Sequence, residues 1–425
     1  MNQQAIKNFS AELFQEHLEE ASFLYEQRIG LLNDPEVTWL DIEEFENRFE
    51  GHIDALVTGE NSAIELCKEQ ANEGDFGELH AAVRVLCRQN KKDLVFEILD
   101  NLDPENVEAI QAVADALKCD IPKEWENDFV DKFSQGDQKL IPIFANVAGY
   151  RRWPVGKKLL ESLQKNPQHP PIIIWALGRL REQDASRLLL NYLKDEDDSV
   201  CSAAGMALLR MGSQQVLKSC ANEAQAKDWP LVLLGLSGNR STISVLVKRA
   251  SGEKPCPDAM VALGLMGDIS AIDVLMSGLN NEETADKSAI ALNIITGANL
   301  FEDAFIPEKL EEDELFEEEL ESFKAGKPPV QQNGEPMGAE VTRASQNPVE
   351  WKNWWKENKP RFAANIRYRS GKPYSQECLL ETLESEFTPH IFRRFTNEEL
   401  VIKYKPEFCF EVDMPVRQQK KCFNK

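Results

Sequence analysis

A short helical motif that recurs about every 29 residues is the strongest constraint on how this chain can fold. The motif reads Ala-Leu-Gly at 176–178 and 262–264, and Leu-Leu-Gly at 233–235. Its leucine recurs in steps of 31, 26, 29 and 29 residues, at Leu177, Leu208, Leu234, Leu263 and Leu292. Weaker copies extend the pattern toward the N-terminus, at Leu86, Leu117 and Ala145. A repeat of this length is typical of units that hold one pair of helices.

Each clear copy is followed by a second stretch with apolar residues at helical spacing. These residues are Leu188, Leu189 and Leu193, then Ile243, Leu246 and Val247, then Ile272, Leu275 and Leu279. Gly212, Gly238 and Gly267 stand at the ends of first helices, where a left-handed residue lets the chain reverse. The sequence therefore predicts an all-α fold, a HEAT-like α-solenoid of helix pairs over residues 81–300, in which small Ala and Gly residues allow close helix packing.

The N-terminal flank, residues 1–80, is strongly acidic. It holds 19 acidic and 4 basic residues and two long amphipathic segments separated by Asn33-Asp34-Pro35. The pattern predicts an N-terminal helical cap that covers the open end of the solenoid. The alternative is a protein-docking helix pair, on which Glu43, Glu44 and Glu46 steer a basic partner.

A second boundary follows the repeats at residues 301–347. Residues 301–325 carry 11 acidic and 2 basic residues, and a segment rich in Pro, Gly and Gln follows them. The segment lacks apolar periodicity, so we expect an acidic loop that contains Pro and Gly. The acidic run lacks the calcium-loop pattern, and a solvated charge run is the favoured interpretation over a cation site.

The C-terminal region, residues 348–425, is expected to be small and mostly helical. Trp351, Trp354 and Trp355 share one helix face, and Arg367, Tyr368 and Arg369 follow. These residues either pack against the last repeats or form an aromatic and arginine platform for a partner or ligand. Residues 340–425 hold 16 basic and 12 acidic residues, so a mildly basic C-terminal end contrasts with the acidic N-terminal one.

Charge and hydropathy exclude several classes of partner. The net charge of −24 disfavours nucleic acid and anionic membrane surfaces, because both require basic surfaces. The longest stretch free of charged residues spans 14 positions, 288–301. A membrane-spanning helix needs about 18. The N-terminal residues lack the basic and apolar regions of a secretory signal, so we expect a cytoplasmic protein with neither membrane nor nucleic acid as partner.

Motifs that carry chemistry are absent from the sequence. It contains no H-E-x-x-H, G-x-S-x-G, P-loop or dinucleotide-binding pattern, and its five histidines are scattered. The nine cysteines form no C-x-x-C pair, so we expect reduced thiols. The sequence thus predicts no catalytic residues, no cofactor and no metal.

The two flanks resemble those of a family of proteobacterial HEAT-repeat proteins. In the N-terminal flank the resemblance rests on residues 19–25 (Glu-Glu-Ala-Ser-Phe-Leu-Tyr), on Leu40, Phe45 and Arg48, and on residues 50–56 (Glu-Gly-His-Ile-Asp-Ala-Leu). In the C-terminal region it rests on Phe362 and on residues 367–373 (Arg-Tyr-Arg-Ser-Gly-Lys-Pro). The resemblance implies an association with type VI secretion gene clusters, and the family supplies neither an activity nor catalytic residues.

Two functions fit these observations. The preferred interpretation is a non-enzymatic scaffold or adaptor that binds protein partners, which the resemblance suggests are type VI secretion components or an effector. The alternative is an enzyme or small-ligand-binding protein whose site lies near Trp351, Trp354, Arg367, Tyr368 and Arg369.

Overall fold

The computed structural model describes residues 3–34, 37–134, 140–165, 169–307, 337–406 and 410–423, together with residues 315, 320, 323, 324, 326, 327, 330 and 334. The described chain is mostly helical, as the sequence predicts. Within these ranges, no helix has both the length and the apolar character needed to cross a membrane.

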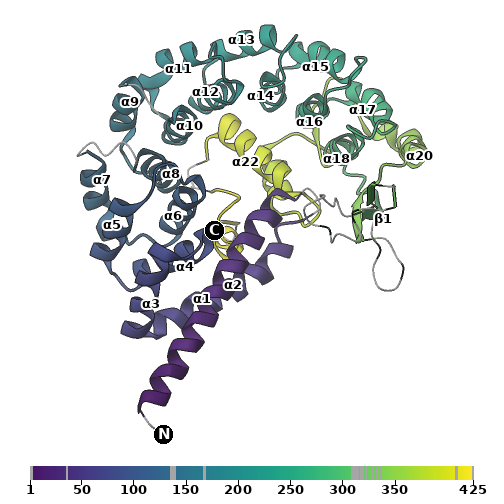
Figure 1. The fold of residues 1–425 in the computed structure, drawn as a ribbon. Coiled ribbons are helices and arrows are strands. Elements are labelled where there is room, and N and C mark those ends of the chain that lie inside the picture. Colours follow the sequence, from purple (N-terminus) through teal and green to yellow (C-terminus); the bar gives the residue numbers. More distant parts are fainter. Residues whose placement is uncertain are drawn as a thin grey trace.

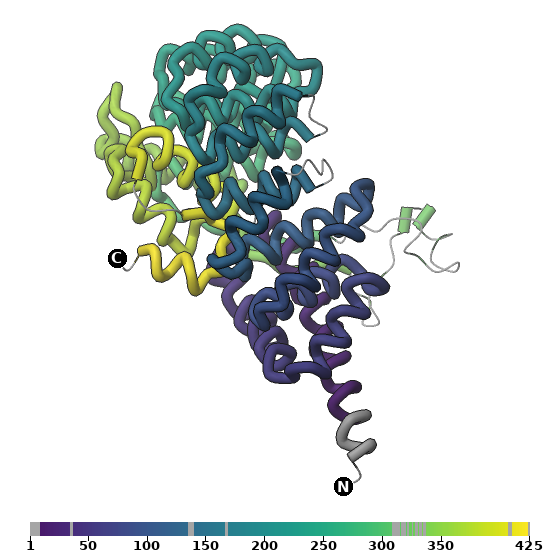
Figure 2. The backbone as a smooth tube through the Cα atoms, turned by 90° about the vertical axis from the view of Figure 1, so that its left-hand side faces the viewer, coloured from purple at the N-terminus to yellow at the C-terminus, as the bar shows by residue number. Residues whose placement is uncertain are grey.

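Three helices open the chain and pack against one another: α1 (Gln3–Asn33), α2 (Asp41–Thr58) and α3 (Glu60–Glu73). Leu18 and Leu24 of α1 are buried together with Ile53 and Leu56 of α2. The N-terminal end of α1 extends beyond the rest of the molecule (Figures 1 and 2).

The repeats form a curved double row of helices (Figure 1). The inner row, in which each helix contacts the next, consists of α4 (Phe76–Arg88), α6 (Val107–Asp120), α8 (Ile141–Arg151), α10 (Pro170–Leu180), α12 (Asp198–Met211), α14 (Pro230–Ser237), α16 (Pro257–Met266) and α18 (Ala285–Thr296). The outer row consists of α5 (Lys92–Asn101), α7 (Glu126–Ser134), α9 (Gly156–Gln164), α11 (Ser186–Tyr192), α13 (Gln215–Glu223), α15 (Ile243–Ala250) and α17 (Ile272–Gly278). Short 3-10 turns precede four outer helices, at Lys123–Trp125, Gln183–Ala185, Arg240–Thr242 and Ile269–Ala271.

The recurring motif marks the inner row. Every marker residue, from Leu86 in α4 to Leu292 in α18, is fully buried on an inner helix. The row begins slightly earlier than predicted, because the expected boundary at residue 80 falls inside α4. Asp75 and Glu78 form a reciprocal capping box that starts this helix.

The glycine of the motif sets the spacing between inner helices. A Cβ added to Gly178 would lie 2.8 Å from the Cα of Ala207, and one added to Gly235 would lie 2.8 Å from the Cα of Ala262. Neighbouring inner helices therefore touch backbone to backbone through Gly and Ala, as predicted. Gly212 (φ 84°) ends α12 in the left-handed conformation, as expected for a sharp reversal.

The segment after the repeats differs from the prediction. We expected a loop over residues 301–347, but β1 (Phe301–Pro307) pairs with β2 (Gly338–Ala344) in an antiparallel hairpin. The paired residues lie between 31 positions apart, for Pro307 and Gly338, and 43 positions apart, for Phe301 and Ala344, so no short turn signal marked the hairpin. The acidic runs at 311–314 and 317–319 lie outside the described residues.

The C-terminal region is mostly helical, as predicted, and completes the molecule. It comprises α20 (Pro348–Asn358), a 3-10 turn (Lys359–Arg361), the short strands β3 (Tyr368–Arg369) and β4 (Lys372–Pro373), then α21 (Gln376–Glu384), α22 (His390–Tyr404) and α23 (Val416–Phe423). α22 lies on the concave side of the curved row, which it meets at α12 and α14 (Figure 1).

Replacing Gly235 with alanine tests the close packing of the inner row. The new methyl group would meet the backbone of Ala262, so we expect Gly235→Ala to lower the free energy of unfolding by about 1–3 kcal/mol. Gly51 in α2 is the matched control because its Cβ would meet no atom within 4 Å. Gly51→Ala should raise the stability by about 0.5–1 kcal/mol, and denaturant unfolding of both variants measures the difference. Equal effects of the two substitutions would contradict this packing.

Candidate functional site

The candidate site is the concave side of the row, where the C-terminal segment meets three arginines of the inner helices. Arg179 lies on α10, Arg210 lies on α12, and Arg152 follows the end of α8 in the left-handed conformation. The arginines therefore project from three successive repeats. They share two carboxylates, Glu398 of α22 and Glu411.

These ion pairs are short and buried. Arg179 binds Glu398 at 2.7 Å and Glu411 at 2.9 Å, and Arg210 binds Glu398 at 2.6 Å. Arg152 binds the second carboxylate, Glu411. Burial disfavours ionisation of Glu411, but the attraction of Arg179, Arg152 and Arg210 outweighs it and lowers the pKa of that carboxyl to about 2.

The predicted arginine and tyrosine cluster lies in the interior. Arg367 and Arg369 bind the two oxygens of Glu399 on α22, and both Arg369 and Glu399 are 0% exposed. Tyr368 is buried as well, and its hydroxyl accepts a hydrogen bond from the Ala363 amide at 2.7 Å. The prediction of a partner-binding platform is therefore corrected for Tyr368 and Arg369, because both side chains are buried and Arg369 is held by a carboxylate of α22.

The predicted tryptophans pack beside this cluster. Trp351 is buried, and its indole N–H donates to the Ser345 carbonyl at 2.6 Å. Trp354 is half-buried, and its ring centroid lies 6.3 Å from that of Phe362, which in turn lies 4.9 Å from Tyr368. The structure brings the tryptophans and the arginine and tyrosine cluster together, but as a packed interior. Of the two arrangements that the sequence left open for these residues, packing in the interior is the one that the structure has.

The three predicted glutamates of α2 divide into two faces. Glu43 binds Lys420 of α23 at 2.6 Å, and Glu46 accepts from Arg28 at 2.8 Å and from the Val416 amide at 2.6 Å. Glu44 is exposed. Charge steering by Glu43 and Glu46 is therefore corrected, because their face of α2 meets the chain's own C-terminal end. Of the three, only Glu44 points to solvent.

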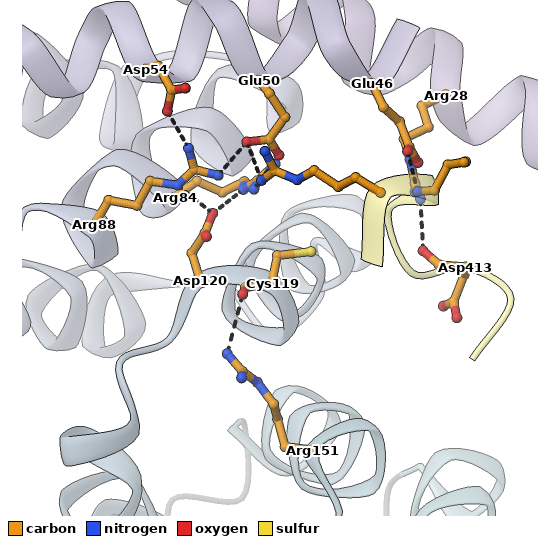
Figure 3. A network of polar contacts seen from close by, with 12 residues as sticks. Arg28, Glu46, Glu50, Asp54, Arg84, Arg88, Cys119, Asp120, Arg151 and Asp413 are labelled. Carbon is orange, nitrogen blue, oxygen red and sulfur yellow. Dashed lines mark hydrogen bonds and ion pairs between the residues drawn. The ribbon is translucent and has the colours of Figure 1, made fainter. Parts of the chain in front are cut away.

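A larger polar network continues from this face, and the sequence analysis did not single out its residues. Glu50 of α2 accepts from Arg84 at 2.8 Å, from Arg88 at 2.6 Å and from Arg417 at 2.8 Å (Figure 3). Asp120 binds both Arg84 and Arg88. The contrast between the acidic N-terminal and basic C-terminal ends was the one signal in the sequence that pointed to this contact.

A polar cavity of about 210 Å³ lies beside the network. Its walls come from α1, α2, the inner helices α4, α6 and α8, and residues 413–415. Tyr25 donates to Asp115 at 3.0 Å, and Lys118 binds the same carboxylate at 2.6 Å. The ring of His80 stacks on Tyr25 with centroids 3.7 Å apart. Burial, together with Arg84, Arg28 and Lys118, lowers the pKa of His80 and keeps its ring neutral.

Neither metal-binding clusters nor disulfides occur among the described side chains. No three His, Cys, Asp or Glu residues in the described ranges converge as metal ligands would. Their cysteines are free thiols, and burial raises the pKa of Cys119 above its ordinary value. A raised pKa makes a thiol a poor nucleophile at neutral pH.

Comparison with known proteins adds no relative. Neither the family comparison nor the search of curated proteins gives a match to this chain. The functional argument therefore rests on the residues described above.

The pH dependence of stability tests the pairing of Glu411. Its pKa lies near 2 in the folded chain and near 4.5 ordinarily, so its contribution is complete above pH 4.5 and is lost as the pH falls toward 2. We expect Glu411→Gln to lower the stability at pH 7 by about 3–5 kcal/mol, because Arg152 loses its ion pair and the buried Arg179 loses one of its two. Chemical denaturation from pH 7 to pH 2 measures both effects.

The variant should also lose less stability than the wild type between pH 4.5 and pH 2. Glu357→Gln is the control, because Glu357 is exposed and has no ion pair among the described residues. A Glu411→Gln profile parallel to that of the wild type would contradict the pairing.

Proposed function

We propose that this protein is a HEAT-like α-solenoid that acts as a non-enzymatic, cytoplasmic scaffold or adaptor for protein partners. Support for the fold comes from the 29-residue period, the marker residues on one row of helices and the glycine contacts between them. The resemblance of the two flanks extends the proposal to an accessory role in type VI secretion. The partners would then be secretion components or an effector.

The observation that carries this proposal is the outward face of α1. Phe9 and Phe23 are 65% and 55% exposed, and Leu13 lies between them on the same side of the helix. The face also carries exposed carboxylates, at Glu12, Glu16, Glu19, Glu20 and Glu26. Large apolar side chains that remain exposed on one helix face are typical of a surface that binds a partner.

The location of this face favours an external partner. The concave side of the row is occupied by α22, whereas α1 extends beyond the rest of the molecule (Figures 1 and 2). Carboxylates that flank aromatic anchors favour a basic partner with apolar side chains. We therefore place docking on α1, with Glu44 of the neighbouring helix adding negative charge.

The competing function, an enzyme or ligand site at the C-terminal cluster, has less support. Trp351, Tyr368 and Arg369 are buried against neighbouring side chains. Arg367 and Arg369 already donate hydrogen bonds to Glu399. A nucleic acid partner is disfavoured by the net charge of −24.

Affinity purification of the tagged protein with quantitative mass spectrometry tests the proposal. We expect Phe9→Ser combined with Phe23→Ser to remove the stoichiometric partner, and Glu16→Lys combined with Glu20→Lys to weaken its capture in a salt-dependent way. These residues are exposed, so the variants should unfold at the wild-type temperature. The control is Val107→Ser, because Val107 is 74% exposed and belongs to α6, not to the α1 face that carries Phe9 and Phe23.

Binding measurements with the purified partner then test docking through α1. Its dissociation constant should rise at least about tenfold for the double phenylalanine variant and stay unchanged for Val107→Ser. Equal binding to all variants, or no stoichiometric partner in any sample, would overturn docking through α1.

A further inference from the structure

The polar cavity beside the network in Figure 3 has the size of a small-molecule site. Its volume of about 210 Å³ has room for about seven water-sized groups. Four regions far apart in sequence line it: the N-terminal helices α1 and α2, the inner helices α4, α6 and α8, Arg394 of α22, and residues 413–415. The cavity therefore depends on the tertiary fold and is not formed by a single loop.

Charges around the cavity balance, but they do not all pair. Four cationic side chains line it, Arg28, Arg84, Lys118 and Arg394, together with four carboxylates, Glu46, Glu50, Asp115 and Asp413. Three ion pairs account for most of them, between Arg28 and Glu46, Arg84 and Glu50, and Lys118 and Asp115. The structure shows neither a hydrogen bond nor an ion pair within 4 Å for the carboxylate of Asp413 or the guanidinium of Arg394 among the described residues, although Asp413 attracts Arg28 and Lys118 at longer range.

The orientation of Asp413 fits a group that is available to a ligand. Arg28 donates to the main-chain oxygen of Asp413 at 2.7 Å and not to its carboxylate. Figure 3 shows the Asp413 side chain turned away from this guanidinium. A cavity-lining carboxylate without a direct ion pair can accept hydrogen bonds from a cationic group.

The cavity is also lined by hydrogen-bond donors that have spare capacity. Lys118 is buried and donates to a single carboxylate, that of Asp115, although an ammonium has three N–H donors. Tyr150 lines the cavity, and its hydroxyl has no hydrogen-bond partner among the described residues. The Lys118 nitrogen lies 5.8 Å from the centroid of the Tyr150 ring. The Nδ1 atom of His80 is also buried and unpartnered. Together the Lys118 ammonium and the Tyr150 hydroxyl provide donors for an anionic group.

We propose that this cavity binds a small zwitterion of the α-amino acid class, whose ammonium group pairs with Asp413 and whose carboxylate accepts from Lys118 and Tyr150. A plain anion would leave Asp413 unpaired, and a plain cation would leave the Lys118 and Tyr150 donors unused. A molecule with both charges satisfies both sets of groups within a volume that fits a small amino acid. Arg394, which is exposed, stands at the mouth of the cavity.

Thermal-shift screening of the purified protein with each of the twenty amino acids, followed by calorimetry, tests this site. We expect at least one amino acid to raise the unfolding temperature in a saturable way. Its N-acetyl and carboxamide derivatives, which each lack one charge, should bind at least about tenfold more weakly. The assay needs no protein partner, so its result is independent of docking through α1.

Two substitutions connect binding to the cavity. Asp413→Asn and Tyr150→Phe each remove one ligand group, and both variants should bind at least about tenfold more weakly. Tyr150→Phe should keep the wild-type stability, whereas Asp413→Asn should fold with lower stability because it removes the longer-range attraction to Arg28 and Lys118. Asp273→Asn is the control, because Asp273 is exposed on α17, outside the cavity. Unfolding temperatures without ligand verify that the variants are folded.

Three results would overturn the proposal. One is the absence of a shift with all twenty amino acids. Another is tight binding of the N-acetyl or carboxamide derivative, which would contradict a zwitterion. The last is wild-type affinity in Asp413→Asn or Tyr150→Phe, which would place the ligand elsewhere.

Discussion

Buried ion pairs between the inner helices and the C-terminal segment are the interaction on which the rest of the structure depends. Arg210 and Glu398, 188 residues apart in sequence, meet in the interior of the molecule. Neither ion is stable there alone, because the desolvation of an unpaired charge costs several kcal/mol. Since Arg152, Arg179 and Arg210 come from successive repeats, the same pairs connect three repeats to α22 and to the segment that follows it.

The opposite charges of the two chain ends have a structural explanation. The acidic face of α2 contacts the basic α23 through Glu43, Glu46 and Glu50. The contact joins the beginning of the chain to its end and closes the polar cavity between them. It leaves the outward face of α1 exposed to solvent. This contact therefore separates the proposed small-molecule site from the proposed docking surface on α1.

Features set by local sequence could be predicted, and features set by distant contacts could not. The marker residues, the glycine at the end of α12 and the close approach at Gly235 follow from a repeating pattern, because each unit contacts its neighbours in sequence order. The ion pair of Arg369 could not be foreseen, because Arg369 lies in β3 and its counter-ion Glu399 lies 30 residues away on α22. The hairpin of β1 and β2 was missed for the same reason, since the paired strands are separated by a long segment.

Hydrogen–deuterium exchange of α22 in the intact protein tests the central claim most directly. If α22 is held on the concave side by buried ion pairs, its amides should be protected as strongly as those of α10 and α12, and Arg179→Ala should reduce protection in α22 more than in the distant α4. Rapid exchange of α22 in the wild-type protein, at the rate of a solvent-exposed helix, would contradict this account.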